Sequence, residues 1–487
     1  MRLSRMLLAL ALPATVLAAG CDIFTPGDDD PHALWISDTG IVLEPGESIT
    51  LTAQFQEHGI RGARPSSAIE PVTDGRWWSE NDAVIRVRGE RRGEVEAVGP
   101  GTTTVWVEMG ARRDSATVTV LGESEEPSRR WKDVSTWMTT TCALDLDGDA
   151  YCWGTNTMGE LGNGPRRFHT QTHRPVRVDA PVRFVQVEAG TTFACGRTDR
   201  GEVWCWGVHR GSQLGHGRTS VDFEEKPVRV AFDGAATQLA VGSQHACLLD
   251  EAGRAHCWGS NLGYQLGIAD AVASSAHLGG RTVPVEFDGT FVELASAAYN
   301  TCGITEDRDL YCWGLVSGGA PGVGREAPLP VRIETTAAPV QISPGDGGSC
   351  YLDAEGRAYC WGIQRLGMTG TTEVPAKIDV SQRFSSLTGP CGIDTEGRTW
   401  CWGMEGLFDP AEATEPCGLP STAMCSTEPV SVSKGLRFRT ISVGIAACGI
   451  ALDGELYCWG SNEFAQLGIG RPRVESTHIP QRVLDPL

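Results

Sequence analysis

The chain has 487 residues, of which 41% are hydrophobic and 21% charged, so it is a globular protein of several domains rather than a disordered or fibrous one. Its formal net charge of -20 disfavours binding to nucleic-acid backbones and to anionic lipid surfaces. Its unusual counts are 17 cysteines, 15 tryptophans and 60 glycines.

Residues 1–20 have the features of a bacterial export signal. Two arginines precede an apolar stretch, residues 6–19, that is too short to span a bilayer. The stretch ends in Leu-Ala-Ala-Gly-Cys at Cys21, which resembles the lipobox of bacterial lipoproteins, with Ala18 where those proteins usually have Leu. We therefore expect a lipid on Cys21, a tether over 21–32, and a cell-envelope protein held at a bacterial membrane by lipid alone. The alternatives are a simple secretory signal and an uncleaved anchor.

Residues 33–121 alternate apolar and polar positions between regularly spaced turn signals, the pattern of an all-β sandwich. A Pro-Gly-Glu turn at 45–47, Trp-Trp-Ser at 77–79 and Val-Gly-Pro-Gly-Thr at 98–102 make this segment similar to group-2 bacterial immunoglobulin-like domains. The polar segment 122–130 is predicted to be a linker.

From residue 131 to residue 487 the chain repeats one unit: Cys, nine residues, Cys, Trp, Gly. The distance between the paired cysteines never varies, whereas the repeat period runs from 41 to 57 residues, so the insertions lie in loops. Four short strands per unit in seven units predict a closed β-propeller. The pairs are Cys142 and Cys152, Cys195 and Cys205, Cys247 and Cys257, Cys302 and Cys312, Cys350 and Cys360, Cys391 and Cys401, and Cys448 and Cys458.

Each cysteine pair is expected to form a disulfide. The sequence between the two cysteines alternates and turns at its centre, which places them opposite each other on two antiparallel strands. Zinc is the weaker alternative, because metal-binding pairs usually have two to four intervening residues and export implies an oxidising compartment. Cys417 and Cys425, in an insertion of the sixth repeat, are predicted to form an eighth pair.

Residues 131–487 resemble the repeats of the regulator of chromosome condensation family. The shared form runs Cys-x-Leu-x-x-x-Gly-x-x-Tyr-Cys-Trp-Gly-x-Asn-x-x-x-Gln-Leu-Gly. The resemblance implies a seven-bladed β-propeller closed by pairing of the chain ends, and we expect residues 480–484 to supply a strand that the first repeat lacks. It also implies guanine-nucleotide exchange on a small GTPase as an alternative function, which export and disulfides disfavour.

A tryptophan follows the second cysteine of every repeat and is predicted to pack between blades. The alternative is an ultraviolet-absorbing indole array, as in one plant member of the family. These residues are Trp153, Trp206, Trp258, Trp313, Trp361, Trp402 and Trp459.

No catalytic constellation stands out, so we expect a protein that is not an enzyme and needs no cofactor. Asp145, Asp147 and Asp149 resemble the start of a calcium loop. In the other repeats, however, Asp or Glu before Gly at this place is ordinary turn chemistry.

Repeats three to six depart from the common form in the same connection, so their insertions crowd one face of the disc. We predict that this face binds a partner, with Leu407 and Phe408 as leading contacts. The alternative is loops that have drifted without a ligand.

Together these features predict an all-β chain, an immunoglobulin-like sandwich followed by a seven-bladed propeller. The expected function is a monomeric, lipid-anchored binding or scaffold protein at the cell surface, which presents propeller loops to a protein or glycan and does not bind nucleic acid. An extracellular enzyme inhibitor is the main alternative.

Overall fold

The computed structural model describes residues 32–486 with gaps. The gaps are 37, 40, 44–47, 58–69, 73–74, 90, 111, 121–128, 165–170, 219–220, 270–279, 321–323, 346–347, 363–371, 379, 405, 409–414, 417–423 and 472–475. Cys21 and Cys417 therefore lie outside the described residues, and the predicted Cys417–Cys425 pair is untested. The part of the chain that is described is built from strands and turns, and it contains no helix long and apolar enough to cross a membrane.

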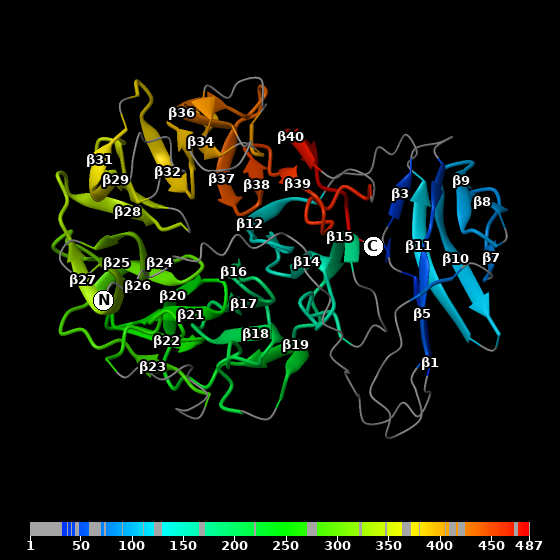
Figure 1. Cartoon of the computed structure of the whole chain (residues 1–487), viewed down its shortest axis with the longest axis horizontal. Helices are drawn as coiled ribbons and strands as arrows, with labels where there is room; N and C mark the ends of the chain where they lie inside the picture. Colours follow the sequence, from blue (N-terminus) through cyan, green and yellow to red (C-terminus); the bar gives the residue numbers. More distant parts are fainter. Residues whose placement is uncertain are drawn as a thin grey trace, which may run out of the picture.

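The N-terminal unit packs three small sheets around one hydrophobic core (Figure 1). Trp77, Ile85, Val105 and Val118 are among its buried side chains. Its strands are β1 (His32–Ile36), β2 (Asp38–Thr39), β3 (Ile41–Leu43), β4 (Ser48–Thr50), β5 (Ala53–Glu57), β6 (Glu70–Pro71), β7 (Arg76–Ser79), β8 (Ile85–Gly89), β9 (Glu94–Ala97), β10 (Gly101–Met109) and β11 (Arg112–Val120).

The rest of the chain forms seven sheets arranged as a disc, which Figure 1 shows from above. The first four sheets, or blades, follow the order of the chain from the axis outward. Their strands are β12 (Trp131–Thr136), β13 (Thr140–Asp145), β14 (Ala150–Thr155) and β15 (Gln171–Arg177); β16 (Gln186–Ala189), β17 (Phe193–Arg197), β18 (Val203–Val208) and β19 (Phe223–Arg229); β20 (Ala236–Val241), β21 (His245–Asp250), β22 (Ala255–Gly259) and β23 (Val283–Pro284); β24 (Phe291–Ser296), β25 (Asn300–Thr305), β26 (Leu310–Ala320) and β27 (Gly324–Ile333).

The last three blades repeat this arrangement, and the sixth carries an additional short strand, β35, outside β36. Their strands are β28 (Pro339–Ser343), β29 (Gly348–Asp353), β30 (Ala358–Gly362) and β31 (Thr372–Lys377); β32 (Phe384–Thr388), β33 (Cys391–Asp394), β34 (Thr399–Met404), β35 (Glu415–Pro416) and β36 (Met424–Ser431); β37 (Phe438–Val443), β38 (Ala446–Ala451), β39 (Leu456–Ser461) and β40 (Ser476–Arg482). The propeller expected from the repeats is confirmed.

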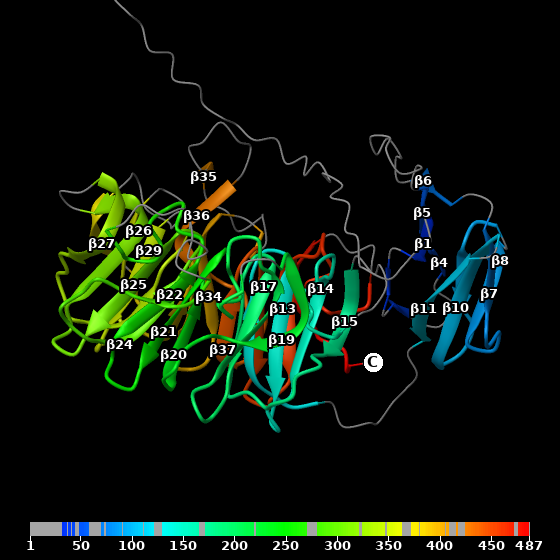
Figure 2. The ribbon, with the colours of Figure 1, turned by 90° about the horizontal axis from the view of Figure 1, so that it is seen from below.

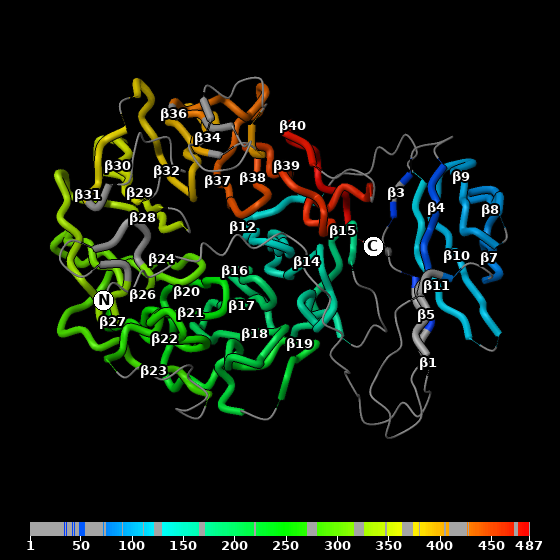
Figure 3. The backbone as a smooth tube through the Cα atoms, in the orientation of Figure 1, coloured from blue at the N-terminus to red at the C-terminus, as the bar shows by residue number. Residues whose placement is uncertain are grey.

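The ring closes without exchange of a strand between the first and last blades. Figure 3 shows the chain passing once around the disc. The C-terminal strand β40 pairs with β39 of its own blade, and the first blade has its own fourth strand, β15. The expectation that residues 480–484 complete the first repeat is therefore wrong. Closure rests on contacts between complete blades, such as the 2.9 Å bond from the Thr136 amide to Ser442 Oγ.

The N-terminal unit joins the rim of the disc at the first blade (Figure 2). Strand β2 pairs in parallel with β15, so that Asp38 and Thr39 lie opposite Gln171 and Thr172. A side-chain bond of 3.0 Å from Arg174 to Thr119 Oγ1 adds to this junction. The outer edge of the first blade is therefore covered by the protein itself.

Candidate interaction face of the propeller

The order of strands in each blade gives the disc two chemically different faces. The first and second strands meet in an inner turn near the axis, and the second and third strands meet in a hairpin at the opposite end. Because the third strand runs back, its connection to the fourth strand lies on the same face as the inner turn. We call this the insertion face, since it carries the insertions of repeats three to six; the other is the hairpin face.

Trp137 lies on the insertion face and links two blades there. It belongs to the inner turn of the first blade, yet its indole N–H donates a 3.2 Å hydrogen bond to Ser243 Oγ of the third blade. On its other side, its backbone packs so closely on Gly444 of the seventh blade that a Cβ there would lie 2.8 Å from the Trp137 oxygen. The inner turn of the second blade also bonds the third blade, because the Thr191 amide donates to the Ser243 carbonyl. The Trp137 side chain thus connects the first blade to the third, while its backbone packs on the neighbouring seventh blade.

The inner turns of the insertion face expose several large hydrophobic side chains. Met138, Tyr299 and Ile445 are exposed in the inner turns, and Leu262, 75% exposed, lies in a neighbouring connection. Apart from Asp346, which lies outside the described residues, the inner turns contain no charged residue. Such neutrality is notable in a chain of net charge -20. Aromatic residues and methionine without charged neighbours are typical of the centres of protein interfaces.

The predicted contacts Leu407 and Phe408 are not part of this surface. They are only 8% and 1% exposed and pack with Phe438 and Trp459 in the core between the sixth and seventh blades. In the regular repeats, the leucine of Gln-Leu-Gly, such as Leu266 beside Trp313, fills the corresponding gap between blades. The prediction that Leu407 and Phe408 bind a partner is corrected: they replace that leucine in the core.

Sequence reasoning missed Trp137, although the sequence contained a signal for it. Trp137 stands five residues before Cys142. At this place the second, third and fifth repeats have Gly190, Gly242 and Gly345. The fourth, sixth and seventh repeats have Ala297, Ser386 and Val443 there, so Trp137 is the one aromatic residue at this position, which indicates a side chain with a role of its own.

The seven repeat tryptophans pack between blades, as predicted, and are at most 1% exposed. Where the preceding repeat keeps Gln-Leu-Gly or Glu-Leu-Gly, the indole N–H donates to the backbone carbonyl one residue before that leucine: Trp153 to Gln466, Trp206 to Glu160, Trp258 to Gln213 and Trp313 to Gln265, at 2.8 to 3.0 Å. The following glycine lies against the indole, and a Cβ at Gly162 would lie 2.7 Å from Trp206. These contacts hold the blades together and leave the indoles no route to solvent.

The cysteine pairs are part of the same packed interior. Cys142 lies directly opposite Cys152 on β13 and β14, and both are completely buried. The structure joins seven such pairs in disulfides, with Cα–Cα distances of 4.0 to 4.1 Å: 142–152, 195–205, 247–257, 302–312, 350–360, 391–401 and 448–458.

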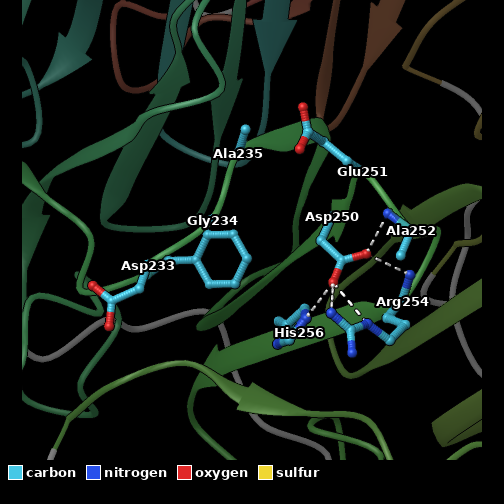
Figure 4. Close-up of a pocket in the computed structure, with 9 residues that line it drawn as sticks. Asp233, Gly234, Ala235, Asp250, Glu251, Ala252, Arg254 and His256 are labelled. Carbon is cyan, nitrogen blue, oxygen red and sulfur yellow. Dashed lines mark hydrogen bonds and ion pairs between the residues drawn. The ribbon is translucent and has the colours of Figure 1, made fainter.

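On the hairpin face, a cavity of about 350 Å³ lies beside the third blade (Figure 4). Asp250 lines this cavity, and its carboxylate accepts hydrogen bonds from the Ala252 and Arg254 amides and from the side chains of Arg254 and His256. Burial opposes ionisation of Asp250, but these bonds outweigh it and its pKa lies below the ordinary value. Phe232 packs on His256, with ring centroids 4.9 Å apart.

The arrangement around Asp250 recurs in other blades and is a device for closing the hairpin. Asp353 accepts from Arg357 and Tyr359, and Asp394 from Arg398 and Trp400. Asp145, once considered for calcium, accepts the amides of residues 147 and 149 and faces Arg129. Within the described residues, no three His, Cys, Asp or Glu side chains are grouped to hold a metal. We therefore assign these aspartates a structural role in closing the hairpins.

Acidic side chains near the axis form contacts between blades. Glu188 accepts a 3.0 Å bond from Ser135 Oγ of the first blade, and Asp133 accepts the Val187 amide of the second. Burial, followed by the charge of Asp133, raises the pKa of Glu188 to about 7. Burial likewise raises the pKa of Asp133. These two hydrogen bonds connect the first blade to the second near the axis.

Comparison with known proteins identifies the repeats. Residues 147–196, 200–249 and 453–487 match the model of the regulator of chromosome condensation (RCC1) repeat, and residues 184–210 and 236–265 match a second model of this repeat. The ultraviolet-B receptor UVR8 of Arabidopsis thaliana is 26% identical over 379 residues, covering 74% of this chain and 72% of that protein. The guanine nucleotide exchange factor SRM1 of Saccharomyces cerevisiae is 23% identical over 388 residues, covering 70% and 72%.

Solved structures agree on the fold. Prp20p of Saccharomyces cerevisiae, described with its binding to Gsp1p and histones, has a TM-score of 0.60 at 19% identity and covers 70% of this chain and 87% of its own. Human WBSCR16 has a TM-score of 0.50 at 19% identity, covering 80% and 90%. The chain therefore carries regulator of chromosome condensation repeats folded as a β-propeller.

Proposed function

We propose that this protein is an exported, lipid-anchored binding protein whose propeller engages a protein partner through the insertion face. The lipobox-like sequence ending at Cys21 supports export and anchoring, and the seven disulfides suit an oxidising compartment. In this proposal residues 33–121 are an immunoglobulin-like spacer between membrane and propeller.

The observation that carries the binding proposal is Trp137 in a set of inner turns that expose apolar side chains and have no charged residue among the described ones. Large aromatic residues at the centre of such a surface usually supply much of the binding energy. The hairpin face differs, because it is rich in charged side chains, and three of its hairpins are closed by ion pairs. We therefore propose that the partner binds the insertion face. The propeller fold by itself does not indicate a binding face.

A photo-crosslinking amino acid placed at Leu262 or Tyr299 in the producing cell tests the insertion face. Leu146, 61% exposed at a hairpin tip, is the matched control position. We expect a discrete crosslinked protein from the two insertion-face positions and its loss on adding Trp137→Asp. Crosslinking from Leu146 alone, or adducts indifferent to Trp137→Asp in a folded variant, would contradict the proposal.

Anchoring has its own test, the intact mass of protein purified from membranes, measured with and without reduction. We expect a diacylated or triacylated Cys21 and no free thiol. An unmodified N-terminus with free cysteines would place the protein in a reducing compartment and overturn this part of the proposal.

Guanine-nucleotide exchange is the second candidate, favoured by the similarity to SRM1. It would require a small GTPase in the same compartment. Release of a fluorescent guanine nucleotide from small GTPases of the source organism, measured with and without the purified protein, tests it. Acceleration would support the exchange function, and none is expected if the protein is exported.

A further inference from the structure

The outer face of one N-terminal sheet carries an aromatic surface that the fold does not require. In the sheet β3-β11-β10-β7, alternation places Trp77, Val105 and Val107 in the core. The alternate residues point outward, and no described residue buries them. In register they form three rows: Arg76, Glu108 and Arg113; Trp78, Trp106 and Ser115; Glu80, Thr104 and Thr117.

Trp78 and Trp106 occupy the centre of this face. They are direct cross-strand partners on β7 and β10, with ring centroids 6.1 Å apart and planes inclined by 11°. Both are only partly buried. Near-parallel rings at this separation offer one aromatic surface rather than two isolated side chains.

Neighbouring polar groups hold this surface in place and surround it. The Trp106 indole N–H donates a 2.9 Å bond to Glu80 Oε1, and the Arg113 guanidinium lies 5.3 Å from the Trp106 ring centroid. The rows beside the tryptophans contain two arginines and two glutamates, so their charges balance locally in a chain of net charge -20. A rigid, neutral aromatic surface with hydroxyl, carboxylate and guanidinium groups beside it is organised before any ligand arrives.

We infer that this face binds a neutral polysaccharide. A pyranose ring presents apolar C–H faces that stack on indoles, and its hydroxyl groups both donate and accept hydrogen bonds. The tryptophans match the first property, and Glu80, Thr104 and Arg113 match the second. Local charge balance favours a neutral chain over an anionic one. The inference is independent of the propeller, because it uses only the N-terminal unit.

The surface also remains clear of the junction with the propeller. Thr119, which contacts Arg174 of the first blade, lies opposite Thr102 on β10. Trp106 is four residues further along that strand, about 13 Å away at the usual rise per residue. A polymer lying across the tryptophans therefore does not meet the first blade at this point.

Co-sedimentation of the purified full chain with insoluble cellulose, chitin and β-1,3-glucan tests the inference. We expect retention on at least one of them. Trp78→Ala combined with Trp106→Ala should reduce retention about tenfold or more, the loss expected from about 1.4 kcal/mol of binding free energy. Replacing both tryptophans by Phe keeps aromatic faces and should restore most of it.

Controls separate this site from the insertion face and from misfolding. Tyr299→Ala removes an exposed aromatic residue of the propeller and should leave retention unchanged. The Ala variants should keep cooperative thermal unfolding, since cross-strand pairs contribute only about 0.2 to 1 kcal/mol. Absence of retention on all three polymers, or equal retention by folded Ala variants, would overturn the inference and leave the tryptophans a sheet-stabilising pair.

Discussion

The indole N–H of Trp206 donates a 3.0 Å hydrogen bond to the backbone carbonyl of Glu160, across the boundary between the first two blades. The corresponding bond is formed where the preceding repeat keeps Gln-Leu-Gly or Glu-Leu-Gly. Trp361, Trp402 and Trp459 follow repeats four to six, which lack this motif, and their buried indole N–H groups have no hydrogen-bond partner among the described residues. Repeats four to six therefore lack both the regular loop and the indole-to-carbonyl hydrogen bond to the next blade among the described residues.

Trp206→Phe should destabilise the protein more than Trp402→Phe. Both changes keep an aromatic ring in the core, but only the first removes a hydrogen bond and leaves a buried carbonyl unpaired. The expected difference in unfolding free energy is about 1 to 2 kcal/mol. Denaturant unfolding of the two variants measures it, and equal losses would show that the bond contributes nothing net.

Glu293→Gln should stabilise the fourth and fifth blades. Gln238, at the same position in the third blade, both donates to the Leu294 carbonyl and accepts its amide, whereas Glu293 only accepts the Ile342 amide. Glutamine supplies the missing donor, for a gain of about 1 kcal/mol. Thermal unfolding of both proteins measures the gain.

The gain from Glu293→Gln should depend on pH. Burial raises the pKa of Glu293 from 4.5 to about 7, so the folded protein holds this proton more tightly than the unfolded chain does. Its contribution to wild-type stability is complete below pH 4.5 and declines as pH rises through 7. Glutamine does not titrate, so the variant's advantage should be larger at pH 8 than at pH 5. The same advantage at both values would contradict this assignment.

Ala465→Gly should stabilise the seventh blade. Ala465 has φ +62°, a left-handed conformation that costs a residue with a Cβ about 1 kcal/mol, whereas the equivalent Gly159 has φ +77°. We expect a rise of about 0.5 to 1 kcal/mol in unfolding free energy. The reverse change, Gly159→Ala, should be destabilising, because its Cβ would lie 2.8 Å from Glu225 Cα. Calorimetry should show a higher unfolding free energy for Ala465→Gly and a lower one for Gly159→Ala. Changes in the same direction for both variants would refute the argument.

The seven described disulfides should resist reduction in the folded protein. Their sulfur-bearing side chains are 0% exposed, so a reductant must wait for a blade to open. Alkylation after dithiothreitol treatment, followed by mass measurement, should show these cysteines unmodified without denaturant and all modified with it. Ready modification of Cys142 and Cys152 under native conditions would mean that the first blade opens locally.

Features determined by short stretches of sequence could be predicted well. The constant Cys spacing and two-residue alternation specify each hairpin, its cysteine pairing and the inward direction of Trp153 and its equivalents, because neighbouring residues on a strand face opposite sides. Seven copies of one unit then fix the propeller. Trp137 could also be recognised in the sequence as the one aromatic residue at its repeat position, although nothing in the sequence indicated what it would contact.

Only the tertiary structure decided which segments become neighbours. The sequence of residues 480–484 fits the fourth strand of any blade. In the structure, strand β40 pairs with β39 and forms the outer edge of the seventh blade. Leu407 and Phe408 lie in an irregular loop and pack in the core, where they fill the space that the leucine of Gln-Leu-Gly occupies in regular repeats. Trp137 reaches Ser243, and Trp78 meets Trp106, through strand arrangement that no local pattern specifies. Local alternation sets the direction of a side chain, whereas its partner depends on closure of the ring and register of the sheet.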